Sequence, residues 1–377
     1  MTRLSIVLVL AVLLSACGSP SNVDAPVELK SFKKLYRVNV DWQRNVGPME
    51  SPGGRMRAAA DNNAIFVVDD SGQVSSLDAE TGKLNWTSSL GKTVSTGITV
   101  GESILAFATR DGEVVAVSAL NGATVWTANV LGSVLSVPSI GNGKVYVQTE
   151  DGRVIALSQR DGTVAWTVER TVPTLSLHGD SGSIFIQGLL AVGLANGHVV
   201  GIDSRNGRVI WDRVVSYPTG RSDVDRISDV DAPPLIAGYR LFAVSYQGKI
   251  MAMDLRNGEV LWTRPMSAYL PFAADSRNLY IVNDQGAVLA IDQASGANVW
   301  VQNDLKNRLS TGPLSLNGKI IVGDKEGYIH ILDSGNGAIS GRYSGDGSRI
   351  LSHLVSDGRI YSLTEKGQLI AYTIKTL

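Results

Sequence analysis

The chain has 377 residues, of which 44% are apolar, 18% are charged and 40 are glycine. Basic and acidic residues nearly balance and leave a net charge of −1, so the composition excludes the strongly basic surface that binding to nucleic acid requires. Frequent glycines between short apolar runs are typical of all-β proteins with many turns.

The first segment has the features of a bacterial export signal. Arg3 precedes an apolar run at residues 4–14, which is too short to span a bilayer. The letters LSAC at residues 14–17 resemble the lipobox of bacterial lipoproteins, in which the signal is cut before the cysteine and the new amino terminus is acylated. We therefore expect a signal peptide at residues 1–16, with Cys17 as the lipid anchor. The alternative is a chance cysteine after an ordinary signal.

The residues after Cys17 bear on location and organisation. Gly18 stands where an aspartate marks retention in the inner membrane, so the lipobox resemblance implies a protein anchored in the outer membrane and facing the periplasm. Residues 17–34 are expected to form the lipidated amino terminus and a tether. Residues 35–377 then form one repeat domain.

A repeated phrase fills that domain. Six of the seven tryptophans each end a phrase of glycine, nine residues, glycine, three residues and tryptophan. Successive phrases begin 38 to 51 residues apart, and periods of this size indicate a solenoid or a propeller. The six tryptophans are Trp86, Trp126, Trp166, Trp211, Trp262 and Trp300.

Each phrase predicts two strands joined by a turn, with a further strand ahead of it. In residues 103–126, for example, an apolar run is followed by a glycine turn, a second run and a second glycine. Both glycines fit turn positions that need positive φ. The residue two positions after the first glycine should be buried, and the residue four positions after it is nearly always small. We expect each tryptophan ring to lie against this small site and to join one unit to the next.

The two ends of the domain are complementary. The last unit, at residues 358–374, stops before its tryptophan strand, whereas residues 35–46 form a tryptophan strand with no unit ahead of it. We therefore predict an all-β, eight-bladed β-propeller of four-stranded blades, whose last blade is closed by the Trp42 strand. One unit has Gly341 in place of its tryptophan, and we expect looser packing there.

Two connections are longer than the repeat requires. They add residues 171–188 and 218–234 on either side of the fourth blade. The acidic stretch at residues 223–231 fails the EF-hand template, because Val230 stands where that loop needs glycine. Binding residues are often found in loops that a rigid scaffold holds in place, which favours a partner-binding role for these segments. The alternative is that they are neutral insertions in surface loops.

Enzyme and ligand-binding alternatives have less support. The docking phrase is similar to that of quinoprotein dehydrogenases, but this chain has one cysteine where their cofactor site uses a vicinal pair. A quinone-dependent dehydrogenase and a propeller that binds cell-wall sugars stay as alternatives. No histidine pair has metal-ligand spacing, and His198 and His330 are expected to have structural roles in strands. We expect no cofactor and no metal.

The lipobox, the eight repeats and two loop sequences, LSLHG at 175–179 and DRISDVD at 225–231, together resemble the BamB family, lipoprotein subunits of the bacterial outer-membrane β-barrel assembly machinery. The resemblance implies a non-catalytic periplasmic scaffold that binds the periplasmic domains of BamA, joins the other subunits of the complex and assists insertion of outer-membrane proteins. It leaves open contact with unfolded outer-membrane proteins. The partner-binding residues that it implies are Leu175, Leu177, His178, Asp229 and Asp231, with His178 standing where an arginine is expected.

Overall fold

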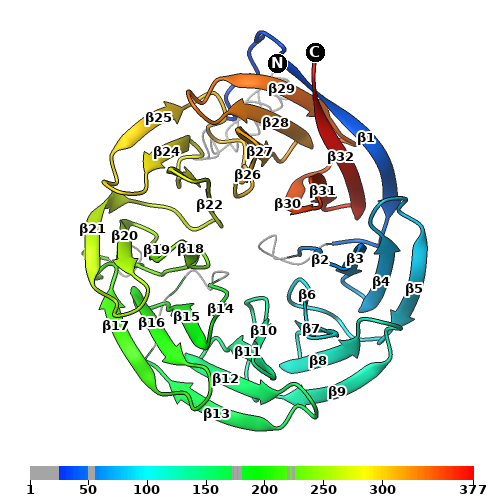
Figure 1. Cartoon of the computed structure of the whole chain (residues 1–377), viewed down its shortest axis with the longest axis vertical. Coiled ribbons are helices and arrows are strands. Elements are labelled where there is room, and N and C mark those ends of the chain that lie inside the picture. Colours follow the sequence, from blue (N-terminus) through cyan, green and yellow to red (C-terminus); the bar gives the residue numbers. More distant parts are fainter. Residues whose placement is uncertain are drawn as a thin grey trace, which may run out of the picture.

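The computed structural model describes residues 25–49, 56–171, 173, 176, 181–218, 221–222 and 226–377. Within these ranges all regular elements are β-strands, which form eight four-stranded sheets arranged in a ring (Figure 1). No helix in this part of the chain is long and apolar enough to cross a membrane. The prediction of an eight-bladed β-propeller is confirmed.

Blades one to four follow each other along the chain, and in each the first strand lies innermost and the fourth outermost. Blade one consists of β2 (Ala59–Asp61), β3 (Ala64–Val68), β4 (Gln73–Asp78) and β5 (Leu84–Ser89). Blade two consists of β6 (Thr99–Gly101), β7 (Ile104–Ala108), β8 (Glu113–Ser118) and β9 (Thr124–Asn129). Blade three consists of β10 (Ser139–Gly141), β11 (Lys144–Gln148), β12 (Arg153–Ser158) and β13 (Val164–Glu169). Blade four consists of β14 (Ile184–Ile186), β15 (Leu189–Gly193), β16 (His198–Asp203) and β17 (Val209–Val214).

Blades five to seven repeat the same antiparallel order. Blade five consists of β18 (Leu235–Ala237), β19 (Arg240–Val244), β20 (Gly248–Asp254) and β21 (Val260–Met266). Blade six consists of β22 (Ala273–Ala274), β23 (Asn278–Val282), β24 (Val288–Asp292) and β25 (Asn298–Gln302). Blade seven consists of β26 (Leu314–Leu316), β27 (Lys319–Gly323), β28 (Tyr328–Asp333) and β29 (Ile339–Ser344).

Blade eight is assembled from both ends of the domain. Its first three strands are β30 (Ile350–Ser356), β31 (Arg359–Thr364) and β32 (Gln368–Thr376), and its outermost strand is β1 (Tyr36–Asn45). β1 runs antiparallel to β32, with Trp42 opposite Ala371. The predicted closure of the last blade by the Trp42 strand is therefore confirmed.

The apolar core lies between neighbouring blades around the whole ring. The residue two positions after each leading glycine is no more than 1% exposed in every blade, as the repeat predicts. These residues are Val74, Val114, Val154, Val199, Ile250, Val288, Ile329 and Leu369. Apolar area removed from water at every blade interface stabilises the ring by about 25 cal/mol per Å².

Seven tryptophans join successive blades. Each Nε1 atom donates a hydrogen bond of 2.7–3.2 Å to a backbone carbonyl in the turn between the third and fourth strands of the next blade. The donor and acceptor residues are Trp42 and Ala79, Trp86 and Ala119, Trp126 and Gln159, Trp166 and Ser204, Trp211 and Leu255, Trp262 and Gln293, and Trp300 and Ser334.

The second glycine of each phrase receives the tryptophan of the preceding blade. Gly82 has a φ of +67°, and a Cβ atom there would lie 2.5 Å from the Trp42 ring. Both the backbone conformation and the close approach therefore require glycine. Within its own sheet each tryptophan lies opposite the small residue of the phrase, as Trp126 lies opposite Ala116. This agrees with the expectation that each indole lies against the small residue.

The position of Gly341 is packed more closely than we expected. A Cβ atom at Gly341 would lie 3.0 Å from the carbonyl oxygen of Tyr36, and the neighbouring Ser340 carbonyl accepts a 2.8 Å hydrogen bond from the amide of Leu35. The expectation of looser packing is wrong. Its physical reason is that β32 and β1 are chain ends, so blade eight has no covalent turn that could receive a tryptophan from blade seven.

Candidate partner-binding face and central cavity

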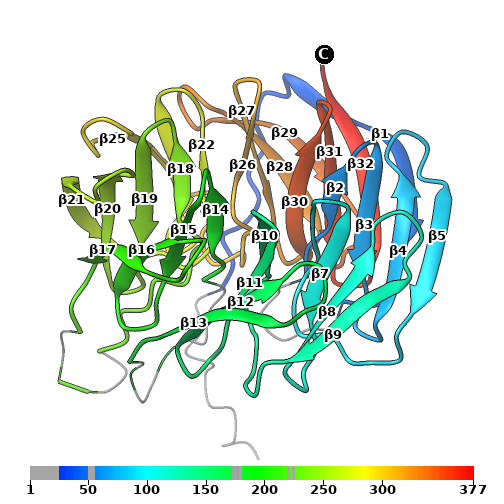
Figure 2. The ribbon, with the colours of Figure 1, turned by 60° about the horizontal axis from the view of Figure 1, so that its bottom comes forward.

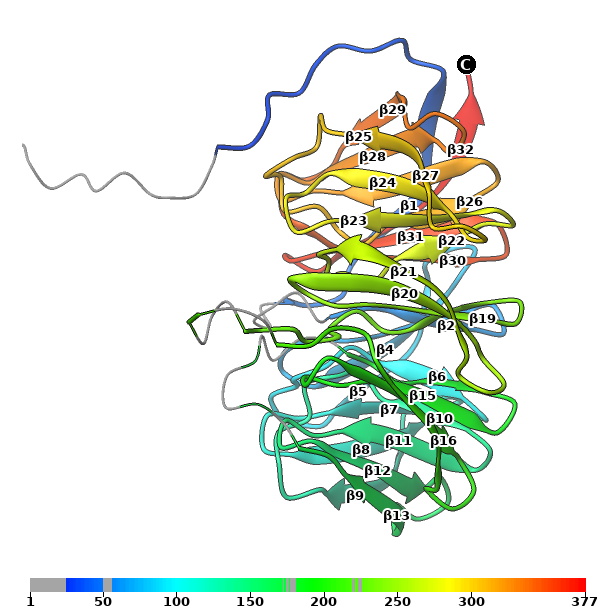
Figure 3. The ribbon, with the colours of Figure 1, turned by 90° about the vertical axis from the view of Figure 1, so that its left-hand side faces the viewer.

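All connections between consecutive blades lie at one end of the ring. We call this end the loop face; it carries residues 46–58, 90–98, 130–138, 170–183, 215–234, 267–272, 303–313 and 345–349, where these are described. The turns that receive the tryptophans lie at the opposite end. Residues 170–183 and 215–234 are the two longest connections, and they flank blade four. Figures 2 and 3 show the described parts of the longer one extending beyond the ring.

The predicted partner-binding residues fall in these two connections. Leu175, Leu177 and His178 lie outside the described residues. Asp229 and Asp231 are described, and they are only 0% and 3% exposed. We expected both aspartates to face a partner, whereas in the chain alone their side chains are buried.

Backbone contacts explain this burial. The amide of Val230 donates to the carbonyl of Leu194 in blade four, and the amide of Tyr246 in blade five donates to the carbonyl of Asp229 at 2.8 Å. Residues 227–232 are thus held between the second-to-third-strand turns of two blades. These two turns are neighbours only because blades four and five are adjacent in the folded propeller. The sequence of the connection alone therefore does not predict its contact with them.

Large apolar side chains are exposed on the same face. Tyr217 in the longest connection is 68% exposed, and Leu131 and Leu309 in two other connections are 82% and 53% exposed. Leu131 and Leu309 also have positive φ values of 53° and 48°. Non-glycine residues seldom adopt this conformation, which costs about 1 kcal/mol or more. The sequence pattern gave no sign that these two leucines are exposed in this conformation.

A cavity of about 720 Å³ occupies the centre of the ring next to the loop face. Its wall combines the connections with the first residues of the innermost strands, so residues far apart in the chain meet there. Apolar side chains make up much of the wall. The polar and charged groups in it include Arg57, Asp231, Tyr246, Tyr269, Ser310, Arg349 and His353.

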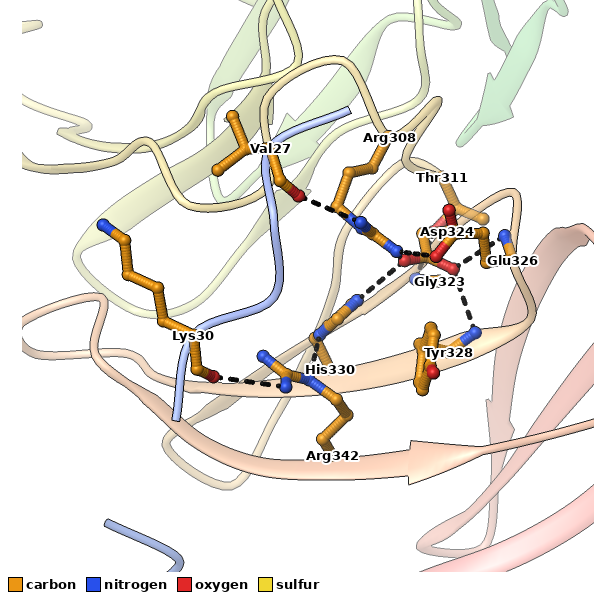
Figure 4. A network of polar contacts seen from close by, with 10 residues as sticks. All are labelled: Val27, Lys30, Arg308, Thr311, Gly323, Asp324, Glu326, Tyr328, His330 and Arg342. Atoms are coloured by element: carbon orange, nitrogen blue, oxygen red, sulfur yellow. Dashed lines mark hydrogen bonds and ion pairs between the residues drawn. The ribbon is translucent and has the colours of Figure 1, made fainter. Parts of the chain in front are cut away.

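The segment before β1 is docked on blade seven (Figure 4). Arg308 donates a 3.0 Å hydrogen bond to the carbonyl of Val27, and Arg342 donates one of 3.3 Å to the carbonyl of Lys30. The Arg342 guanidinium also lies 4.8 Å from the centre of the Phe32 ring, a cation–π contact. Residues 25–34, expected to form part of a tether, are therefore already attached to the ring.

A buried charge network holds the two arginines in place. Arg308 donates to the carboxylate of Asp324 at 2.7 Å, and Asp324 in turn accepts a 3.1 Å contact from Nε2 of His330. Nδ1 of His330 accepts from Arg342, which fixes the ring proton on Nε2. Burial lowers the pKa of His330 even though Asp324 acts in the opposite direction, so the ring is neutral.

The two strand histidines have structural roles, as the sequence predicts. His330 belongs to the network just described. His198 begins β16, and its Nδ1 atom lies 2.7 Å from the carboxylate of Asp212 on the neighbouring strand. This pair joins two strands of blade four.

The fold and this face define a class of protein: a tryptophan-docked β-propeller with long, irregular connections at one end of the ring. Over residues 37–97, 86–302 and 285–377 the sequence matches the family described as outer membrane protein assembly factor BamB. The chain belongs to this family.

Individual relatives agree with that assignment. The chain is 42% identical to the outer membrane protein assembly factor BamB of Pseudomonas aeruginosa over 98% of both chains. It is 39% identical to the BamB of Legionella pneumophila over 97% of both chains. The crystal structure of BamB from Moraxella catarrhalis has a TM-score of 0.82, with 23% identity over 89% of this chain and 99% of that one.

A more distant structural neighbour is an enzyme. A quinohemoprotein alcohol dehydrogenase from Pseudomonas putida matches with a TM-score of 0.73 and 12% identity, over 89% of this chain and 76% of its own. At this identity the likeness concerns the fold alone.

Proposed function

We propose that this chain is a non-catalytic scaffold of outer-membrane protein assembly, anchored to the outer membrane through Cys17 and facing the periplasm. Its loop face binds the periplasmic domains of BamA and so brings the propeller to the other subunits of the complex. Membership of the BamB family supports the assembly role. The observation that carries the binding site is the position of the two longest connections, which flank one blade on the loop face.

Two kinds of residue contribute to this proposed interface. Leu175 and Leu177 supply apolar anchors, and buried anchors of this kind dominate the free energy of protein association. His178 lies beside them in the sequence. Asp229 and Asp231 are buried in the chain alone, so we assign them the role of holding the longer connection in its binding position.

A capture experiment tests the site. Leu175→Asp combined with Leu177→Asp should abolish binding to purified BamA periplasmic domains, because two charges replace apolar contacts. Glu259→Lys, an exposed change at the opposite end of blade five, is the matched control and should bind normally. A double variant that keeps its melting temperature and still binds BamA with unchanged affinity would place the interface elsewhere.

The anchor is tested separately. Cys17→Ala should move the protein from the membrane fraction to the soluble periplasmic fraction, because several acyl chains are needed for stable attachment and the chain has no other cysteine. Mass spectrometry of the wild-type protein should show an acylated amino terminus at Cys17. Continued recovery of the variant in outer membranes would contradict lipid anchoring at this residue.

A further inference from the structure

Three buried donor groups in the wall of the central cavity have no hydrogen-bond partner in the described part of the chain. They are Nε of Arg349, Nε2 of His353 and Oγ of Ser310. Leaving such a group unsatisfied costs about 1–3 kcal/mol, and more for a charged group. Ser310 lies in the connection to blade seven, Arg349 in the connection to blade eight and His353 in β30, and all three line the same cavity. An acceptor bound in the cavity would satisfy such donors.

The hydrogen bonds behind His353 make it a donor. Nδ1 of His353 lies 2.7 Å from the hydroxyl oxygen of Ser362, which lies 3.0 Å from the hydroxyl of the buried Tyr372. Ser362 is the only partner of the Tyr372 hydroxyl among the described residues, so we assign the phenol as the donor to Ser362. In that assignment Ser362 donates to Nδ1, and the ring proton resides on Nε2. Burial lowers the pKa of His353 to about 3, so this donor is neutral.

The charges in the cavity wall favour one negative charge. Among the described residues of the wall, Arg57 and Arg349 are positively charged, Asp231 is negatively charged and His353 is uncharged, so these side chains sum to one positive charge. Arg349 forms no hydrogen bond or ion pair with any other described side chain. A guanidinium matches the two oxygens of a carboxylate in a bidentate pair.

The rest of the wall is apolar. Its apolar side chains include Val137, Leu270, Leu314, Leu351 and Leu354, together with three prolines. A volume of about 720 Å³ lies within the range of small-molecule sites, about 300–1,000 Å³. The cavity thus combines an apolar chamber with a cluster of donors at one side.

From this arrangement we propose that the central cavity is a binding site for a small amphiphilic monoanion, a carboxylate carried on an apolar body. The carboxylate accepts from Arg349, His353 and Ser310, and the apolar body packs on the leucines. The site opens at the end of the ring that carries the loop face, but it shares no residue with the leucine anchors. The proposed anion site can therefore be tested independently of the contact with BamA.

A fluorescent probe tests this site in the full-length processed protein. The dye 1-anilinonaphthalene-8-sulfonate is an aromatic monoanion, and we expect it to bind the protein at one saturable site. Octanoate should displace it, whereas octan-1-ol and octylamine, which have the same chain without the negative charge, should be much weaker competitors. Equal competition by all three compounds would overturn the carboxylate assignment.

Variants locate the site. Arg349→Gln should weaken dye binding about tenfold or more, the effect expected from losing a charged hydrogen bond, and Arg349→Lys should restore part of it. Ser352→Trp, which fills the cavity, should abolish binding. Arg160→Gln, an exposed change on an outer turn, is the matched control. If Arg349→Gln or Ser352→Trp keeps its melting temperature and binds the dye as the control does, the cavity is not the site.

Discussion

The indole nitrogen of Trp42 lies 3.0 Å from the carbonyl oxygen of Ala79, and this hydrogen bond joins the last blade to the first. The same carbonyl accepts a second hydrogen bond, of 2.9 Å, from the hydroxyl of Tyr361. Arg359 of the same blade adds a third, longer hydrogen bond of 3.4 Å, so three donors from blade eight close the ring, whereas the carbonyl of Ser204 has Trp166 as its only described donor. This difference separates two otherwise equivalent tryptophans.

Replacing these tryptophans should reveal that difference. Trp42→Phe should cost about 1 kcal/mol in the free energy of unfolding beyond the loss of ring area, because Tyr361 still satisfies the carbonyl. Trp166→Phe should cost more, since it leaves a buried carbonyl unsatisfied, at about 1–3 kcal/mol. Trp42→Ala, which removes the ring, should cost about 3–5 kcal/mol. Urea titrations measure all three, and a larger loss for Trp42→Phe than for Trp166→Phe would refute the argument.

The receiving glycines give a second test. Gly82→Ala places a Cβ atom 2.5 Å from the Trp42 ring, in addition to the strain of a φ of +67°. Gly91 has a similar φ of +61° but nothing within 4 Å of its Cβ position, so Gly91→Ala isolates the backbone cost of about 1 kcal/mol. We expect Gly82→Ala to lower the thermal midpoint clearly more. Equal midpoints for the two variants would show that the ring does not need the close approach.

Docking of the amino-terminal segment is tested through Arg342. Arg342→Gln removes the hydrogen bond to Lys30 and the contact with Phe32, so amide hydrogen exchange in residues 25–34 should become faster. The rest of the ring should exchange as before, apart from the neighbourhood of His330. Arg277→Gln, an exposed change in blade six, is the control. Unchanged protection of residues 25–34 would mean that Arg342 does not hold them.

His353 gives a prediction for pH. Its pKa in the folded state is about 3 because burial disfavours the charged form, whereas its ordinary value is 6.5. Between these values the unfolded chain binds a proton that the folded chain does not, so stability falls as the pH decreases from about 6.5 towards 3. His353→Gln should lose less stability than the wild type between pH 7 and pH 4, measured by urea unfolding. Parallel pH profiles would contradict a buried neutral histidine.

The periodic part of the fold is predictable because its physics is local. The glycine turns, the buried residue two positions later and the tryptophan strand recur in each phrase, and residues such as Val114 and Trp126 lie where the pattern puts them. The innermost strands are harder to predict. β6 has three residues and β22 has two, too few to show an alternating pattern.

The candidate sites were only partly predictable because they depend on contacts across the ring. The long connections could be found from their spacing alone. The burial of Asp229 depends on a turn in blade five, and the cavity brings Arg349 near Asp231, over a hundred positions away in the chain. The close packing at Gly341 could not be predicted without knowing that blade eight has no turn between its third and fourth strands. These contacts form only when the ring closes, so the sequence of a single repeat does not predict them.

Because residues 25–34 are attached to blade seven, only the segment between Cys17 and Ala25 is left as a tether. Asn307, in a connection of the loop face, donates a hydrogen bond to the carbonyl of Ala25, so the chain leaves the ring on the side of that face (Figures 2 and 3). Only eight peptide steps separate Cys17 from Ala25, and fully extended they reach about 30 Å. Under the proposed lipid anchoring at Cys17, Ala25 stays within about 30 Å of the bilayer surface. Encounters with membrane-bound partners would then be a search over a shallow layer near the membrane.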